Sequence, residues 1–243
     1  MLMLSIIIPT YNEKENIILL IPRLHKTLNH GAVAPSSQSP IGLQDPKLGT
    51  KYEIIVVDDN SPDGTAAAAE TFPFVRVVRR ESKQGLTSAV LAGVAAANGE
   101  LVLVMDADLS HPPETVLKML EAMGKADLVI GSRLLAGGGV ENWPFHRKMI
   151  SKAAEFLARA VLGVKVSDPL SGFFLVKKSL FKKTRFRTKG YKLLLNILAD
   201  NPKTKAVEVP YVFKDRHSGK TKLGYGEIVT YLFDLLRIKI RSG

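Results

Sequence analysis

Short, strongly apolar runs that alternate with helix-forming segments constrain the fold of this chain more than any other feature. The runs cover residues 4–8, 53–57, 75–78, 101–105 and 128–130. Helical spacing or composition marks residues 12–28, the alanine-rich segment after residue 63, and residues 86–97 and 113–123. Buried strands that alternate with helices are typical of a mostly parallel sheet covered on both faces. The pattern therefore predicts an α/β fold whose binding site lies outside the carboxyl ends of the strands.

Chain length and composition narrow the organisation further. The 243 residues suit one domain over positions 1–243, and the 46% of apolar residues argue against a mostly disordered chain. Residues 30–50 are rich in small and turn-forming residues without periodicity, so we expect a surface insertion there. The absence of cysteine excludes disulfides, thiolate metal ligands and cysteine nucleophiles. No apolar stretch approaches the roughly 18 residues that a membrane span needs.

Charge divides the chain into two unequal halves. Residues 1–121 contain 10 basic and 14 acidic side chains, a net charge of −4, whereas residues 122–243 contain 24 basic and 9 acidic ones, a net charge of +15. This asymmetry suggests a metal or catalytic site on one side and an anionic partner on the other. Nucleic acid, a phosphorylated substrate and an anionic membrane surface all have the required charge. A nucleic-acid-binding module is disfavoured because it would leave the acidic residues at the strand ends unexplained.

Acidic side chains follow two of the predicted strands directly. Asp58 and Asp59 follow one strand, and Asp106 and Asp108 follow another. Carboxylates at the end of a buried strand are costly unless they meet a cation or a hydrogen-bond donor. Hard oxygen ligands without a His or Cys cluster favour Mg²⁺ or Mn²⁺. Helix capping is the alternative interpretation for Asp58 and for Asp63 in the following turn, and for Asp63 it is equally good.

The ordered motifs of the chain resemble a known enzyme family. In order, these are Pro9-Thr-Tyr-Asn-Glu13, Asp58-Asp-Asn-Ser-Pro-Asp-Gly-Thr65, Asp106-Ala-Asp-Leu-Ser-His-Pro-Pro113 and Gly131-Ser-Arg133. They resemble family-2 glycosyltransferases of the GT-A fold. The continuation Trp143-Pro-Phe-His-Arg147, Asp168-Pro-Leu-Ser171 and the segment 216–222 resembles the dolichol-phosphate mannose synthases within that family.

The resemblance implies a role for each matching residue. The guanosine of a GDP-mannose donor would be held by Pro9, Tyr11, Glu13, Val57 and Asp59. Its diphosphate and a metal ion would be held by Asp106, Ala107 and Asp108, with Ser110 near the metal where some relatives have Gln. Arg133, Arg216 and Lys222 match basic positions around the diphosphate and the sugar, and Arg147 and Ser151 match positions that face the acceptor phosphate.

The implied reaction transfers mannose from GDP-mannose to dolichyl phosphate, aided by Mg²⁺ or Mn²⁺, with inversion at the anomeric carbon. Asp106, Asp108, Arg133 and Arg147 would carry the chemistry. In-line displacement needs cations to hold two anions more than it needs a strong base. The alternative from the same motifs is a polyprenyl-phosphate β-glucosyltransferase that uses UDP-glucose.

Two amphipathic segments, 145–163 and 224–241, predict C-terminal helices that face a membrane or a partner, although core packing explains such spacing equally well. Their polar stripes include Glu155 and Asp234, respectively. Residues 177–192 contain eight basic and no acidic side chains, with Phe181, Phe186 and Tyr191 between them, a composition that suits lipid headgroups. We therefore expect peripheral association with the cytosolic face of the endoplasmic reticulum, or the equivalent prokaryotic surface, and small transmembrane partner subunits.

Overall fold

The computed structural model describes residues 3–30, 51–186, 192–214 and 225–242. The strands are β1 (Leu4–Thr10), β2 (Tyr52–Asp58), β3 (Val75–Arg79), β4 (Leu101–Val104), β5 (Leu128–Ser132), β6 (Gly139–Val140), β7 (Phe174–Lys177), β8 (Ala206–Pro210) and β9 (Val212–Phe213). The helices are α1 (Lys14–His30), α2 (Thr65–Glu70), α3 (Leu86–Ala96), α4 (Pro113–Met123), α5 (Phe145–Leu162), α6 (Lys178–Lys183), α7 (Leu193–Asp200) and α8 (Tyr225–Ser242). The insertion predicted for residues 30–50 lies, from residue 31 on, outside the described residues.

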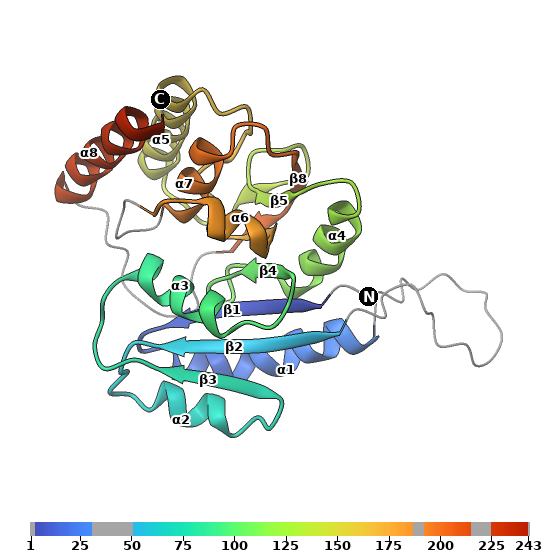
Figure 1. Ribbon diagram of the computed structural model, residues 1–243. Coiled ribbons are helices and arrows are strands. Elements are labelled where there is room, and N and C mark those ends of the chain that lie inside the picture. The colour runs from blue at the N-terminus through green and yellow to red at the C-terminus, as the bar shows by residue number, and fades with distance from the viewer. Residues whose placement is uncertain (1–2, 31–50, 187–191, 215–224, 243) are drawn as a thin grey trace.

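Seven strands form one sheet in the order β3-β2-β1-β4-β7-β5-β8 (Figure 1). The pairs β1–β2, β1–β4, β2–β3 and β5–β8 are parallel. Strand β7 is antiparallel to both of its neighbours, β4 and β5. The mostly parallel α/β sheet predicted from the sequence is therefore confirmed, and β7 joins its two parallel parts.

Helices cover both faces of this sheet because its strands are apolar on both sides. Neighbouring residues of a strand point to opposite faces, and Ile6 and Ile7 are each fully buried in a different core cluster. Helices α1 and α4 pack on the face of Ile6, and α3 and α7 pack on the face of Ile7. Each such buried isoleucine stabilises the fold by about 2 kcal/mol.

Helices α5 and α8 lie together next to α7, beyond the sheet (Figure 1). Their buried sides pack with α7 in a third cluster that contains Ala158 of α5, Leu195 of α7, and Leu235 and Ile238 of α8. Their other sides expose large apolar side chains, namely Phe145, Met149, Ile150 and Phe156 on α5 and Leu232, Phe233, Leu236 and Ile240 on α8. Each helix thus has both a core side and an exposed apolar side.

Two details of the amphipathic prediction are wrong. Glu155 and Asp234, placed on solvent-facing polar stripes, are only 2% and 5% exposed. Asp234 accepts a hydrogen bond from Lys192 Nζ at 2.8 Å, which supplies the partner that its burial requires. Buried ion pairs at these positions tie the helices to the rest of the molecule.

The basic segment 177–192 also differs from its prediction as a headgroup-binding surface. Phe181 is 5% exposed and stacks on Phe186 at 5.7 Å within the core on the α3 face. Phe181, on α6, therefore packs inside the protein, and Phe186 packs partly buried against the same cluster. Tyr191 lies outside the described residues.

Candidate active site

The predicted nucleotide residues lie at the carboxyl ends of β1 and β2. Pro9 and Val57 face each other in the parallel register and are both buried, so they can offer a ligand only backbone groups. Tyr11 is 37% exposed, and Lys83 Nζ lies 3.8 Å from the centre of its ring. A cation over an aromatic face is stabilised by the ring's negative potential. Lys83 therefore joins this edge although no motif indicated it.

Asp59 is held by two groups from the segment after β3. Its carboxylate lies 3.0 Å from Arg80 Nη1 and accepts a hydrogen bond from the backbone N–H of Gln84 at 3.2 Å. Both charged side chains of this pair are at most 10% exposed, so each needs the other. Glu13, at the start of α1, accepts a hydrogen bond from Asn16 at 2.6 Å.

Asp58 and Asp63 organise the turn after β2. Asp58 accepts hydrogen bonds from the hydroxyl of Thr10 at 2.9 Å and from the backbone and hydroxyl of Ser61 at 2.9 and 2.6 Å. Asp63 accepts from both donors of Thr65 and from the backbone N–H of Lys14. Although partial burial opposes the shift, these hydrogen bonds lower the pKa of Asp63. The contacts support helix capping for Asp63, which binds the first backbone N–H groups of α1 and α2, whereas Asp58 holds Thr10 and Ser61 and caps neither helix.

The aspartates after β4 sit in a tight turn. Leu109 has a left-handed backbone with φ 62°, so the chain reverses between Asp108 and Ser110. Asp108 is 5% exposed, and its Oδ1 accepts from the backbone and the hydroxyl of Ser110. Ser110 thereby orients the Asp108 carboxylate, and its role as a metal ligand stays a prediction. The adjoining Ala107 is buried, at 3% exposure.

His111 supports the first aspartate of the pair. Its Nδ1 accepts a hydrogen bond from the backbone N–H of Asp106 at 2.9 Å, so a neutral imidazole carries its proton on Nε2. That nitrogen lies 4.0 Å from Asp106 Oδ2. The ring stacks on Phe173 at 4.7 Å and meets the edges of Tyr211 and Phe213. Packing therefore fixes the imidazole that faces the Asp106 carboxylate.

Two carboxylates fit a divalent ion that keeps further positions for phosphate and water. Asp106 and Asp108 supply hard oxygen donors, which Mg²⁺ and Mn²⁺ prefer. Over the ranges that the structure describes, no cluster of three or more His, Cys, Asp or Glu side chains could hold a metal. A nucleoside diphosphate would therefore have to complete the coordination, as is usual for Mg²⁺ at phosphate-transfer sites.

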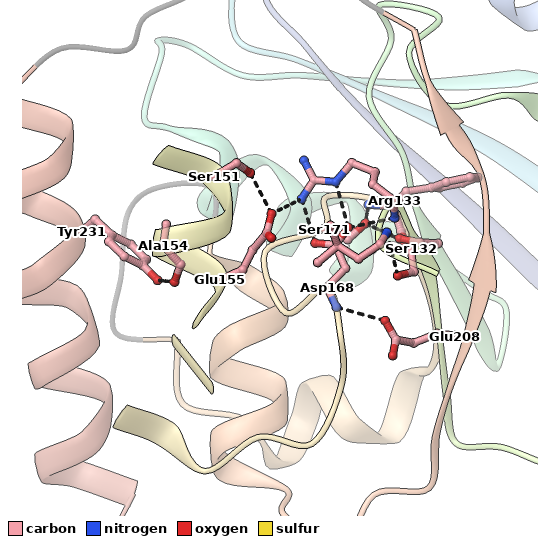
Figure 2. A network of polar contacts seen from close by, with 12 residues as sticks. Ser132, Arg133, Ser151, Ala154, Glu155, Asp168, Ser171, Glu208 and Tyr231 are labelled. Carbon is pink, nitrogen blue, oxygen red and sulfur yellow. Dashed lines mark hydrogen bonds and ion pairs between the residues drawn. The ribbon is translucent and has the colours of Figure 1, made fainter. Parts of the chain in front are cut away.

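Arg133 anchors a second polar network, which Figure 2 shows from close by. Its Nε and Nη2 donate to the two oxygens of Asp168 at 2.8 and 2.7 Å, and its backbone N–H donates to the same carboxylate at 3.0 Å. Burial alone would lower the pKa of Arg133, but the hydrogen bonds and charge of Asp168 outweigh it and raise the pKa. The guanidinium is therefore a permanent cation, clamped in one orientation.

Glu155 connects this network to α5. Its Oε1 lies 3.7 Å from Arg133 Nη2 and accepts a hydrogen bond from the Ser151 hydroxyl at 2.7 Å (Figure 2). Burial raises the pKa of Glu155, and the nearby Asp168 charge acts in the same direction. On the other side, Glu208 accepts from the backbone N–H groups of Ser167 and Asp168 at 2.7 and 3.0 Å. Arg133, predicted on the donor side, and Ser151, predicted on the acceptor side, thus both contact the buried Glu155 carboxylate.

Arg147 lies in the first turn of α5, four residues before Ser151. Its guanidinium carbon is 3.9 Å from the ring centre of Trp143. Arg216 and Lys222 lie outside the described residues. The structure thus brings Arg133 and Ser151 together and places Arg147 one turn away from Ser151. No motif assigned a role to Lys83, His111, Trp143, Glu155 or Glu208. His111 and Glu155 are buried polar residues, whereas Lys83, Trp143 and Glu208 are indicated only by their contacts in the fold.

The family model described as Glycosyl transferase family 2 matches residues 5–185. This chain belongs to that family. It is 41% identical to a dolichol-phosphate mannosyltransferase of Pyrococcus furiosus over 96% of this chain and 63% of that protein. It is 34% identical to the dolichol-phosphate mannosyltransferase of Saccharomyces cerevisiae, over 97% of this chain and 86% of the relative. The chain therefore spans less than two thirds of the archaeal relative and most of the yeast one.

Solved glycosyltransferase structures share the fold. Glucosyl-3-phosphoglycerate synthase from Mycobacterium tuberculosis, solved with Mn²⁺, UDP and glucosyl-3-phosphoglycerate, matches with a TM-score of 0.67 at 21% identity, over 99% of this chain and 80% of that one. Mannosyl-3-phosphoglycerate synthase from Rubrobacter xylanophilus matches with a TM-score of 0.69 at 19% identity, over 99% of this chain and 73% of that one. At these identities the likeness establishes the GT-A fold. Within the described ranges, no helix has the length and hydropathy of a membrane span.

Proposed function

We propose that this glycosyltransferase transfers mannose from GDP-mannose to dolichyl phosphate, with dolichyl β-D-mannosyl phosphate and GDP as products. The supporting observation is identity of 34–41%, over at least 96% of this chain, to three proteins named dolichol-phosphate mannosyltransferase. A 36%-identical relative from Mycolicibacterium smegmatis is named polyprenol monophosphomannose synthase. Four relatives with mannose in their chemistry favour this donor over the UDP-glucose alternative. The product would supply mannose for N-glycosylation, O-mannosylation and GPI-anchor synthesis.

In this reaction an oxygen of the acceptor phosphate attacks the anomeric carbon, and the bond from that carbon to GDP breaks. The bonding electron pair leaves with the diphosphate, and attack opposite the leaving group converts the α-linked donor into a β-linked product. A phosphate monoester has a second pKa of about 6, so the acceptor is nucleophilic near neutral pH. The residues of this chain therefore bind and align the substrates rather than remove a proton.

Asp106 and Asp108 would hold Mg²⁺ or Mn²⁺, which when bound neutralises charge on the leaving diphosphate. Ser110 orients Asp108, and His111 faces Asp106. Pro9, Tyr11, Glu13, Val57 and Asp59 would bind the guanosine, and Arg147 and Ser151 the acceptor phosphate. Because Arg133 is clamped by Asp168, we assign it first to positioning of the site; direct contact with the donor stays a prediction, as do the roles of Arg216 and Lys222.

We also propose peripheral attachment to a membrane, on the cytosolic face of the endoplasmic reticulum or its prokaryotic equivalent. The support is the exposed apolar side of α5 and α8, where Phe145 and Ile240 are 78% and 77% exposed. Apolar side chains on adjacent helices beside basic residues suit a lipid interface or small transmembrane subunits. Such an arrangement would bring the lipid-linked acceptor to Arg147 at the start of α5.

One assay tests the reaction. The chain is incubated with GDP-mannose and dolichyl phosphate, with and without EDTA, beside parallel reactions that contain UDP-glucose or 3-phosphoglycerate. We expect a mannolipid only from GDP-mannose and dolichyl phosphate, and its loss in EDTA. A glucolipid of equal yield, or transfer to 3-phosphoglycerate, would contradict the proposal.

A further inference from the structure

Trp143, the single tryptophan of the chain, stands between the strand β6 and the helix α5. Strand β6 pairs with β9, and the backbone N–H of Glu141 donates to the Phe213 carbonyl at 2.9 Å. Asn142 then adopts a left-handed backbone with φ 58°, which turns the chain sharply before the helix. Pro144 caps the helix at φ −58°, a value to which its ring restricts it. The position of the indole is therefore set by a paired strand and two constrained residues.

The indole ring of Trp143 has two different neighbours. The ring centres of Trp143 and Phe213 are 5.5 Å apart, and their planes make an angle of 69°, which is an edge-to-face arrangement. The Arg147 guanidinium lies 3.9 Å from the indole centre, four residues along the chain. Phe213 in turn contacts His111, which faces Asp106. A chain of rings thus runs from the aspartate after β4 to the arginine of α5.

The indole nitrogen adds a second feature. Trp143 Nε1 is buried, and within the ranges that the structure describes this N–H has no hydrogen-bond partner. An indole N–H can only donate, and a buried donor without an acceptor loses its hydrogen bond to water without replacement. Such a group is most easily explained by an acceptor that arrives with a ligand. Beside a guanidinium, the acceptor that fits is an anionic oxygen.

We propose that Trp143 belongs to the acceptor-phosphate subsite: its ring holds the Arg147 guanidinium in place, and its indole N–H donates to an oxygen of the same phosphate. This rests on the proposed function for the assignment of Arg147 to the acceptor phosphate and for the identity of the acceptor as a lipid phosphate monoester. Trp143 is a positioning residue through Arg147 and a ligand contact through Nε1. The two contributions are separable because phenylalanine retains an aromatic face and lacks the N–H.

The test compares Trp143→Phe and Trp143→Leu with the wild-type chain by calorimetric titration with farnesyl phosphate, and with GDP as the donor-side control. We expect binding of farnesyl phosphate to weaken about threefold in Trp143→Phe and about tenfold in Trp143→Leu, with GDP affinity unchanged. Equal affinity of all three chains overturns the proposal. If the two variants are equally weak, the ring does not hold Arg147; if Trp143→Phe equals wild type, Nε1 does not donate.

Wild-type fluorescence provides a measurement that needs no variant and survives a folding defect in Trp143→Leu. Because the chain has one tryptophan, farnesyl phosphate should change its emission over the concentration range of the calorimetric isotherm, and GDP should not. Binding without a change in emission overturns the proposal. If the Trp143 variants bind farnesyl phosphate more weakly but the wild-type chain transfers no mannose, only the proposed function is refuted. If the wild-type chain transfers mannose but the variants bind farnesyl phosphate as tightly as wild type, only this inference is refuted. A wild-type chain that does not bind farnesyl phosphate refutes both.

Discussion

The donor edge after β1, β2 and β4 and the acceptor side around α5 are both rich in charge, but they are assembled differently. At the donor edge, Asp108 accepts hydrogen bonds from Ser110 and Asp63 from Thr65, each two residues away, although Asp59 also pairs with Arg80 from the segment after β3. Around α5, the Arg133 guanidinium donates hydrogen bonds to Asp168 across 35 residues, and Glu155 links this donor-side arginine to the acceptor-side Ser151. A turn can position its own side chains, whereas a long-range ion pair depends on the whole fold. Substitution of a strand-end aspartate such as Asp108 should therefore affect mainly the chemistry, whereas substitutions in the network around Arg133 should affect stability as well.

The largest effect should follow from Asp108→Asn. Loss of a charged metal ligand removes about 4 kcal/mol of transition-state stabilisation, or roughly a thousandfold in kcat, while the local turn retains its hydrogen bonds. Mannose transfer and thermal unfolding are measured together. Asp63→Asn is the matched control, because Asp63 caps a turn at the same edge, and its activity should stay within a fewfold of wild type. Near-normal turnover of Asp108→Asn would show that the donor edge does not carry the metal.

Asp168→Ala tests the network around Arg133. Removal of a fully buried partner leaves the Arg133 charge poorly compensated, so the free energy of unfolding should fall by about 3 kcal/mol. Asp127→Ala is the control, since the Asp127–Lys177 pair is 37% and 47% exposed at its two side chains and should cost less than about 1 kcal/mol. Denaturant unfolding measures both. Equal losses in the free energy of unfolding would show that the buried Arg133–Asp168 pair contributes no more to stability than the surface Asp127–Lys177 pair.

A smaller effect should separate the two sides of α8. The exposed pair Leu232→Ser and Leu236→Ser should leave unfolding unchanged but weaken binding to anionic liposomes by roughly tenfold. Leu235→Ser, at a position that is 1% exposed, should instead destabilise the fold by about 3 kcal/mol. Liposome co-sedimentation and thermal unfolding distinguish these outcomes. If the exposed pair unfolds the protein, the proposed membrane surface belongs to the core.

The smallest effect concerns pH. Because burial raises the pKa of Glu155, its ionised form is less favourable in the folded than in the unfolded chain. Stability from the protonated carboxyl is fully present below the unfolded pKa of about 4.5 and is lost as the pH rises through the folded pKa. As the pH rises from 4.5 through the folded-state pKa, the free energy of unfolding of the wild-type chain should therefore fall relative to that of Glu155→Gln. Denaturant unfolding at a series of pH values measures this difference. A constant difference between the two chains would mean that the pKa of Glu155 is not raised.

The strand–helix pattern of the first half was predictable because each segment carries its own periodicity. Ile6 and Ile54 lie in strands whose composition alone indicates burial on both faces. Strand β7 was missed because Phe174–Lys177 is short and runs into a basic segment, and its antiparallel place between β4 and β5 has no local signature. Trp143 was part of a quoted motif, but its contact with Arg147 depends on the turn at Asn142.

By itself, the sequence determined the α/β class, the carboxylates at the strand ends and the amphipathic character of α5 and α8. These features are local, since backbone periodicity and turn residues act over a few positions. Only the tertiary structure decided which side of each helix is buried and that Glu155 joins Ser151 to Arg133. Amphipathic spacing defines an apolar face, but the face that meets the core depends on which distant elements pack against it. The buried Asp234 shows this, because its partner Lys192 lies 42 residues away and nothing near it in the sequence predicts the contact.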